Sequence, residues 1–224
     1  MKRMLFITGT DTGVGKTVLT ALLTRFLRER GINAAALKPI CSGGRGDARA
    51  LHAAMNGALT LDEINSWHFR APIAPLLASR KENKRVKFSQ ILAHARAMQK
   101  HFDVVLVEGV GGLLSPLGEN FNSRDLILAL RATPIIVAQS RLGAVNHVLL
   151  TLGALPENFR VKAKIVLMSP SKPDAATKSN ARLLEQFLSP EKILSLPCLG
   201  EKRELAEVLK VSQVRRTLNL LAEI

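Results

Sequence analysis

The chain has 224 residues, of which 47% are hydrophobic and 22% charged, and its 32 basic and 18 acidic side chains give a net charge of +14. This length and apolar content exclude a disordered chain and predict a single globular domain over residues 1–224. No apolar run is long enough to cross a bilayer, and two cysteines are too few for a disulfide framework, so membrane-spanning and disulfide-stapled classes are excluded.

Short apolar runs rich in β-branched residues alternate with amphipathic helical patterns. The runs predict strands at residues 5–8, 34–37, 104–107, 135–138, 165–168 and 193–196. The amphipathic patterns predict helices at residues 16–30, 88–101, 124–131, 145–152, 174–188 and 204–221. Pro134 is expected to open one strand, where its missing N–H is tolerated. Continuous apolar strands separated by helices predict a three-layer α/β/α fold with a mainly parallel sheet, of the type found in P-loop nucleotidases.

The first predicted strand leads into a glycine-rich turn, Gly9-Thr10-Asp11-Thr12-Gly13-Val14-Gly15-Lys16-Thr17. Such a turn between a strand and a helix is typical of a phosphate-binding loop, because backbone N–H groups converge on an anion and glycines allow close approach. We expect Lys16 to contact the β- and γ-phosphates and the Thr17 hydroxyl to ligate Mg²⁺. The first glycine lies one residue before its usual position, which Thr10 occupies. A plain strand-to-helix turn is the alternative.

Ligands of parallel sheets bind beyond the carboxyl ends of the strands, so the residues after each strand are further candidates. Lys38 follows the second strand and could point its ammonium at the same phosphates, although a surface lysine would give the same pattern. Glu108 ends the third long strand, where it could supply a second Mg²⁺ contact, a helix cap or a structural salt bridge. Asp47 could cap a helix or ligate a metal, and its spacing does not decide between them.

The turn after the fourth strand holds Gly143 and Asn146, which suit the start of a helix. The N-terminus of that helix could hold another anion.

Five blocks of the sequence resemble the dethiobiotin synthetase family. They are the phosphate loop at residues 9–17, Lys38-Pro39-x-x-Ser42-Gly43, Ala71-Pro72-Ile73-Ala74-Pro75-Leu76-Leu77-Ala78, Val107-Glu108-Gly109-x-Gly111-Gly112 and Leu142-Gly143-x-x-Asn146-His147. The blocks occur in the family's order and span residues 4–152, whereas the resemblance is weak beyond residue 165. The phosphate loop is shared by many nucleotide-binding proteins, but the Lys-Pro, Ala-Pro and Asn-His blocks are far more specific.

The resemblance implies a ligase of biotin biosynthesis that uses ATP and Mg²⁺ to join CO₂, drawn from bicarbonate, to diaminopelargonate. In such enzymes a substrate amine captures CO₂ as a carbamate, which attacks the γ-phosphate of ATP. The neighbouring amine then closes the carbamic–phosphoric anhydride to the ureido ring of dethiobiotin, and phosphate and ADP leave. This chemistry needs cations to bring together a carbamate and a triphosphate, which repel each other, more than it needs general bases.

The resemblance also assigns roles to individual residues. It implies a catalytic set of Lys16 and Lys38 beside the γ-phosphate with the hydroxyls of Thr12 and Ser42, and a Mg²⁺ set of Thr17, Asp47 and Glu108. Nucleotide contacts are expected at Thr10, Asp11, Thr12, Gly13, Val14, Gly15, Lys16, Thr17, Glu108 and Gly111. Substrate contacts are expected at Thr12, Lys38, Ser42, Gly111, Gly143, Ala144, Val145 and Asn146. The last four match a segment that binds the substrate's distal carboxylate from the opposite subunit, which implies a homodimer.

Two positions depart from the family pattern. Gly13 stands where relatives often have an acidic residue, and Met168-Ser169-Pro170 stands where they place an asparagine that reads adenine. These departures leave open a catalytically silent nucleotide-binding subunit. A partition-type or regulatory ATPase of the same fold is another alternative, although such proteins usually carry a lysine where Thr10 and Asp11 stand. An amidotransferase-like synthetase would normally need a glutaminase half with a cysteine–histidine nucleophile.

The positive charge is spread along the chain, and its densest cluster, at residues 80–87, is typical of a surface loop. Aromatic residues make up only 4% of the chain and tyrosine is absent, so bases would have few side chains to stack on. We therefore expect a solvated basic surface with no nucleic-acid and no membrane partner. The first strand begins close to Met1, which leaves no room for a signal peptide, so a reducing cytoplasm is the expected location.

Overall fold

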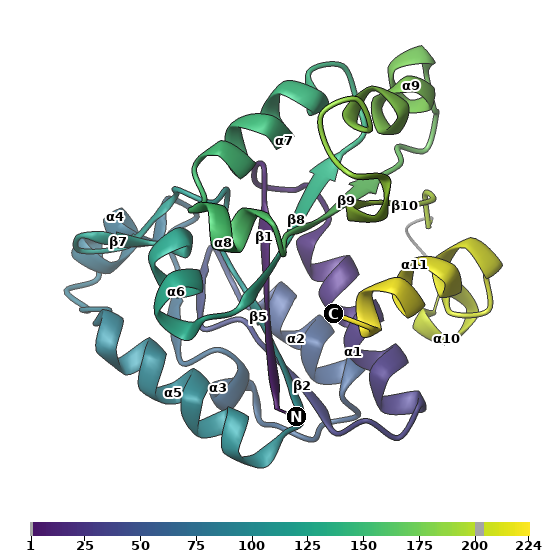
Figure 1. The fold of residues 1–224 in the computed structure, drawn as a ribbon. Coiled ribbons are helices and arrows are strands. Elements are labelled where there is room, and N and C mark those ends of the chain that lie inside the picture. The colour runs from purple at the N-terminus through teal and green to yellow at the C-terminus, as the bar shows by residue number, and fades with distance from the viewer. Residues whose placement is uncertain (1, 200–203) are drawn as a thin grey trace.

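The computed structural model describes residues 2–199 and 204–224 and is built around a six-stranded parallel sheet (Figure 1). The strands, in spatial order, are β10 (Ile193–Leu196), β9 (Lys164–Met168), β8 (Thr133–Gln139), β1 (Arg3–Gly9), β5 (Val104–Glu108) and β2 (Ala34–Leu37). All five neighbouring pairs are parallel. Each predicted strand is therefore present, and the predicted parallel sheet is confirmed.

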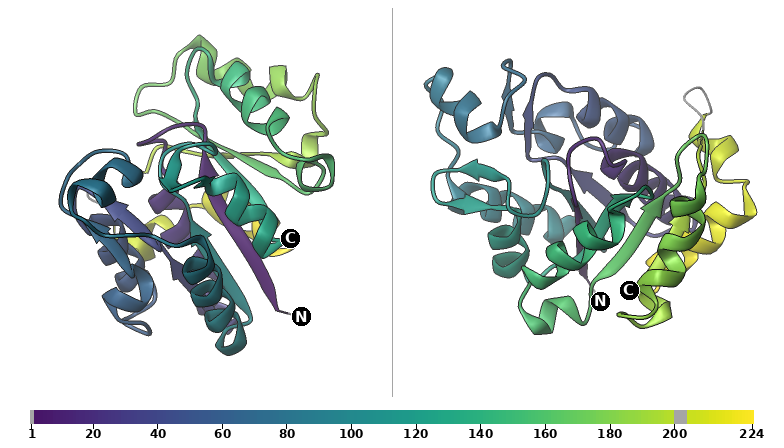
Figure 2. Two further views of the ribbon diagram at one scale, coloured as in Figure 1. Left: turned by 90° about the vertical axis from the view of Figure 1, so that its left-hand side faces the viewer. Right: turned by 90° about the horizontal axis from the view of Figure 1, so that it is seen from above.

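Helices cover both faces of the sheet (Figures 1 and 2). On one face lie α1 (Lys16–Glu29), α2 (Gly46–Ala54) and α11 (Ser212–Ala222), which contact β5, β2 and β10 in that order. On the other lie α5 (Phe88–His101), α6 (Ser123–Leu130), α7 (Ala144–Gly153), α8 (Glu157–Arg160) and α9 (Ala175–Leu184). The three-layer α/β/α prediction is confirmed.

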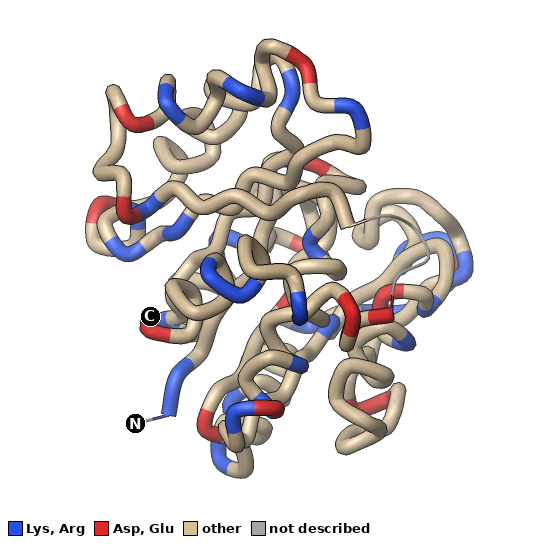
Figure 3. The backbone as a smooth tube through the Cα atoms, turned by 90° about the vertical axis from the view of Figure 1, so that its right-hand side faces the viewer, with Lys and Arg blue, Asp and Glu red and all other residues tan. Residues whose placement is uncertain are grey.

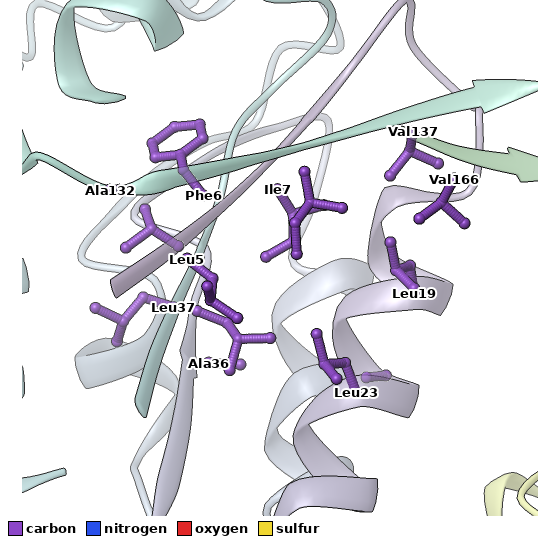
Figure 4. Packing of buried hydrophobic residues seen from close by; sticks show 14 of the residues in the cluster. Leu5, Phe6, Ile7, Leu19, Leu23, Ala36, Leu37, Ala132, Val137 and Val166 are labelled. Carbon is purple, nitrogen blue, oxygen red and sulfur yellow. The ribbon is translucent and has the colours of Figure 1, made fainter. Parts of the chain in front are cut away.

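The core joins the central strand to the helix that follows the phosphate loop. Leu5 and Ile7 of β1 lie on the α1 side of the sheet, where Leu19 and Leu23 of α1 meet them (Figure 4). All four side chains are buried. Residues 19–24 of α1 are all buried, and α1 contacts α2 and α11 as well as the sheet. The helix is thus enclosed on several sides, which fixes the direction in which its N-terminus points.

Three sequence-based boundaries are wrong. The helix predicted at 174–188 is α9, which ends at Leu184. The helix predicted at 204–221 is two helices, α10 (Leu205–Val208) and α11, separated by a turn. Val211 between them has an extended backbone, with ψ of 121°, and caps α11, so the helical spacing is interrupted there. Each helix packs through its own buried residues, such as Val208 in α10 and Val214 in α11. Pro134 is the second residue of β8, not the first, because Thr133 already pairs with Leu5. The pairing of β8 with β9 starts only at Ile135, so the missing N–H of Pro134 removes no hydrogen bond from that pairing.

Short elements surround the carboxyl edge of the sheet and were not predicted. They are β3 (Ile40–Ser42), α3 (Leu61–Ile64), β4 (Trp67–Phe69), α4 (Pro75–Lys81), β6 (Pro116–Gly118) and β7 (Phe121–Asn122). Two more elements were not predicted, namely α8 and a 3₁₀ turn at Pro190–Lys192, which leads into the amino end of β10. The predicted loop at 80–87 is correct from Glu82 onward, but Arg80 and Lys81 form the last turn of α4.

Lys and Arg residues are distributed over the described chain rather than gathered in one patch (Figure 3). Among the described residues, no helix has both the length and the apolar character to cross a membrane.

Replacing Leu23 by alanine should lower the free energy of unfolding by about 2–5 kcal/mol, because it leaves a cavity between α1 and the sheet. Urea titration followed by circular dichroism measures the change. The matched control is Val161→Ala, since that side chain is 59% exposed and its loss should change stability by less than about 0.5 kcal/mol. Equal effects of the two substitutions would contradict the assignment of Leu23 to the core.

Candidate active site

The phosphate loop connects β1 to α1 through residues 10–15. Gly15 caps α1 with φ of 100°, and Gly13 has φ of 74°, both in the left-handed region that favours glycine. No side chain caps α1 and its first turn carries no acidic residue, so its N-terminal N–H groups have no side-chain acceptor at the cap. This end of α1 is therefore suited to bind an anion.

Gly9 must be small because the loop folds back over it. A Cβ at Gly9 would lie 2.8 Å from a Val14 methyl and 3.0 Å from the Lys16 ammonium. The Lys16 ammonium donates a hydrogen bond to the Asp11 carbonyl at 2.7 Å, so it is held beneath the loop. Burial and the nearby Lys38 ammonium lower the pKa of Lys16 to about 8, against the opposing pull of Glu108.

Lys38 lies at the centre of a buried charge cluster. Its ammonium is 2.6 Å from Glu108 Oε1 and 3.0 Å from Asp47 Oδ2, and it also donates to the Gly109 carbonyl at 2.9 Å. Burial would lower the pKa of Lys38, but the two carboxylates outweigh it and raise that pKa above its ordinary value. Lys38 is therefore a permanently charged cation and not a surface lysine.

Thr17 and Asp47 complete this cluster. The Thr17 hydroxyl donates to Glu108 Oε1 at 2.7 Å, which ties α1 to the end of β5. Asp47 is in the first turn of α2, whose N-cap is Arg45, so the capping alternative for Asp47 is wrong. Burial raises the pKa of the Asp47 carboxyl, but the Lys38 ammonium and the Thr17 hydroxyl outweigh it, and that pKa lies below its ordinary value.

One oxygen of this cluster has no protein partner: Glu108 Oε2 is buried and accepts no hydrogen bond. An unpaired buried carboxylate oxygen is costly unless a cation approaches it. Together with the Thr17 hydroxyl and the Asp47 carboxylate it forms an all-oxygen set, which suits Mg²⁺ in a site completed by phosphate oxygens. The described residues contain no group of three or more His, Cys, Asp or Glu placed to hold a metal ion by themselves.

A cavity of about 830 Å³ opens beside this cluster. Its walls bring together most of the predicted site residues, namely Thr12, Gly13, Gly15, Lys16, Thr17, Lys38, Ser42, Asp47, Glu108 and Gly111. Thr10 and Asp11 line a smaller neighbouring hollow, and Val14 is buried beneath the loop. Gly111 has φ of 64° and a Cβ there would collide with the Ser115 hydroxyl, so this position in the lining requires glycine.

The structure does not bring Gly143, Ala144, Val145 and Asn146 into this cavity. Gly143 has φ of 88° and caps α7, and Asn146 lies exposed in the first turn of that helix, as the sequence predicts for a turn into a helix. α7 has no side-chain cap and no acidic residue in its first turn. Asn180 of α9 holds the preceding turn by donating to the Arg141 carbonyl at 3.0 Å.

Several cavity residues received no predicted role. An apolar wall is formed by Pro72, Ile73, Ala74 and Pro75, with Val110 and Pro116 beside it. The Ala-Pro block at 71–78 was a sequence signal for this wall, but its composition alone does not say what it contacts. Cys41 also lines the cavity, and burial raises the pKa of its thiol to about 12, so it stays protonated.

Comparison with known proteins places the chain among P-loop enzymes. A family described as AAA domain matches residues 3–207. ATP-dependent dethiobiotin synthetase BioD from Akkermansia muciniphila is 39% identical over 200 residues, covering 89% of this chain and 91% of that protein. The proteins of the same name from Thermodesulfovibrio yellowstonii and Bacillus subtilis are 38% and 33% identical, covering 94% and 93% of this chain and 92% and 90% of those proteins.

Solved structures share the fold at low sequence identity. The structure of pNOB8 ParA bound to nonspecific DNA has a TM-score of 0.63 at 12% identity, with 100% of this chain and 98% of that chain covered. The hydrogenase maturation factor HypB from Archaeoglobus fulgidus has a TM-score of 0.52 at 14% identity, with 99% and 89% covered. At these identities the likeness concerns the arrangement of strands and helices alone.

Replacing Lys38 by methionine should lower the free energy of unfolding by about 3–5 kcal/mol, because it leaves the buried Glu108 carboxylate without its cation. Adding Glu108→Gln to this variant should recover part of the loss, since the uncompensated charge is removed. Urea titrations of the single and double variants measure both effects. Lys210→Met is the control, because Lys210 forms an exposed pair with Glu207 and its loss should cost less than about 1 kcal/mol. Strictly additive losses in the double variant would contradict the buried pairing.

Proposed function

The chain belongs to the ATP-dependent dethiobiotin synthetase family, and from that premise we propose that it is itself such an enzyme. Its substrates are diaminopelargonate, CO₂ or bicarbonate and ATP, and its products are dethiobiotin, ADP and phosphate. The observation that carries the proposal is the meeting of two buried lysines with the phosphate loop in one cavity. The two free cysteines, Cys41 and Cys198, agree with an enzyme of the reducing cytoplasm.

The cavity can gather the reacting anions. The carbamate formed on one substrate amine and the triphosphate of ATP are both negative, so bringing them together in water is unfavourable. Lys16 beneath the phosphate loop and Lys38 at the end of β2 offset that repulsion and stabilise charge as the γ-phosphate is transferred to the carbamate oxygen. Because the neighbouring amine of the substrate then attacks the anhydride and phosphate leaves, the protein needs to orient the diamine more than to activate it.

Hydroxyl and oxygen ligands support these two lysines. Thr12 and Ser42 line the cavity, where their hydroxyls can donate to the carbamate or the phosphate. The Thr17 hydroxyl and the carboxylates of Asp47 and Glu108 are the residues that would hold Mg²⁺. When bound, Mg²⁺ supplies neutralisation of the phosphate charge.

We also propose a homodimer in which α7 of one subunit faces the cavity of the other. The start of α7, with Gly143, Ala144, Val145 and Asn146, would bind the substrate's distal carboxylate. Gly143 and Asn146 are its exposed residues, whereas Ala144 is buried and its N–H bonds to the Arg141 carbonyl at 3.0 Å. Leu142 and Leu150, at the two ends of this region, are 82% and 65% exposed, as expected for side chains that a partner covers.

The decisive experiment measures phosphate release from ATP with bicarbonate and Mg²⁺, with and without diaminopelargonate, and identifies the product by mass spectrometry. We expect release that depends on the diamine and a product with the mass of dethiobiotin. Hydrolysis of ATP that does not depend on the diamine would favour a regulatory ATPase, and no turnover with any nucleotide would favour a catalytically silent binding protein.

Lys16→Ala should lower kcat by about 1,000-fold or more with little change in thermal stability, because a cation beside the transferring phosphoryl group is lost.

Replacing Asn146 by alanine should raise the KM for the diamine about tenfold with little effect on kcat, because the contact concerns an end of the substrate remote from the reaction. Steady-state kinetics with the diamine as the varied substrate measures the change. Asn56→Ala, an exposed asparagine near the end of α2, serves as the control. An unchanged KM in the Asn146 variant would rule out this carboxylate contact.

A further inference from the structure

The apolar wall of the cavity, residues 72–75, is an irregular segment with few backbone donors. It follows β4 and ends on the first residue of α4, and it contains Pro72 and Pro75, neither of which has an N–H group. Pro72 packs closely on Gly43, since a Cβ at Gly43 would lie 2.9 Å from Pro72 Cβ. The N–H of Gly43 bonds to the Phe69 carbonyl at 3.1 Å, which fixes the chain just before the segment. The position of the wall therefore depends on how residues 70 and 71 are held.

One carboxylate holds them. Glu82 Oε1 accepts hydrogen bonds from the backbone N–H groups of Arg70, at 2.6 Å, and Ala71, at 3.3 Å. Its other oxygen is 3.2 Å from the Lys84 ammonium, and the Glu82 side chain is only 17% exposed. Partial burial raises the pKa of the Glu82 carboxyl, but the hydrogen bond from Arg70 and the Lys84 ammonium outweigh it, so the pKa lies below its ordinary value. The group is thus ionised at neutral pH and makes charge-assisted hydrogen bonds.

The backbone of Glu82 is itself anchored. Glu82 is the C-cap of α4, and its N–H bonds to the Ala78 carbonyl at 3.0 Å. Since α4 begins at Pro75, the carboxylate connects the end of that helix to the start of the segment that leads into it, so residues 70–82 form a closed loop. Glu119 on the neighbouring hairpin braces the same helix through a two-point ion pair with Arg80, but it does not touch the segment.

We propose that Glu82 is a positioning residue for the diamine: by holding Arg70 and Ala71 it sets the apolar wall at Pro72–Pro75 against which the aliphatic chain of the substrate packs. This proposal rests on the proposed function, because that function supplies the substrate. Glu82 is absent from the lining of the cavity, so it acts through the segment and not by contact with the diamine. The phosphate loop, Lys16 and Lys38 belong to other elements, so the nucleotide should not sense the change.

The test combines kinetics with hydrogen exchange on the full chain. Glu82→Ala should raise the KM for the diamine about tenfold while kcat and the KM for ATP stay within about twofold. In the same variant, amides of a peptide spanning residues 69–76 should exchange faster in the absence of any substrate. Glu82→Gln keeps an oxygen acceptor for both N–H groups and should give intermediate values in both measurements. Glu119→Ala removes the exposed ion pair on α4 and should match the wild type in KM and in exchange.

Three results would overturn the proposal: unchanged exchange at residues 69–76 in Glu82→Ala, faster exchange with an unchanged KM for the diamine, or a fall in kcat without a change in KM. If Glu82→Ala does not fold, Glu82→Gln carries the same comparison. Failure of the proposed function is separate, because it appears as wild-type protein that releases no diamine-dependent phosphate. In that case the diamine is not the molecule that packs on the apolar wall. Hydrogen exchange at residues 69–76 still decides whether Glu82 holds this segment in place.

Discussion

The pairing of Lys38 with Glu108 is the interaction on which the rest of the site depends. β2 and β5 are neighbours in register, with Leu37 beside Val107, so the next residue of each strand, Lys38 and Glu108, emerges at the same edge. β1 flanks β5 on the other side, with Ile7 beside Glu108, and therefore delivers the phosphate loop to the same place. Three adjacent parallel strands thus bring three sequence-distant motifs together, because the carboxyl ends of parallel strands share one edge of the sheet.

Burying these charges is tolerable only because they are balanced. Lys16 and Lys38 provide two buried positive charges, which buried Glu108 and the half-exposed Asp47 balance with two negative charges. Each carboxylate or ammonium alone would be costly to bury, whereas the paired arrangement keeps them ionised. The one oxygen left over, Glu108 Oε2, is the place where a further cation would complete the balance. The same electrostatics that stabilise the free site therefore prepare it for a negatively charged nucleotide and a metal ion.

The sequence predicts the sheet, the phosphate loop and the positions of Lys38 and Glu108, because strand periodicity and the carboxyl-edge rule need no tertiary information. It leaves Asp47 undecided, since capping and metal ligation have the same spacing, and only the fold shows that its carboxylate meets Lys38. The short elements β3, β4 and α4 are not predictable, because segments of three to seven residues carry too little periodic signal and are held by their neighbours. The hydrogen bond between Glu82 and Arg70 cannot be predicted from the sequence for the same reason, because it joins residues twelve positions apart that belong to no regular strand or helix pairing.

The composition of the cavity also bears on the homodimer that we propose. Among the described residues that line it, Lys16 and Lys38 are the only cations, and both lie at the phosphate end. Pro72, Ile73 and Pro116 form an apolar wall of the cavity. A diamine whose amines react beside Lys38 would extend its chain along this wall and bring its carboxylate to a region without a positive side chain. The N–H groups at the start of α7 carry the missing positive potential, but they lie outside the cavity of their own chain, so a second copy is the simplest source of that contact.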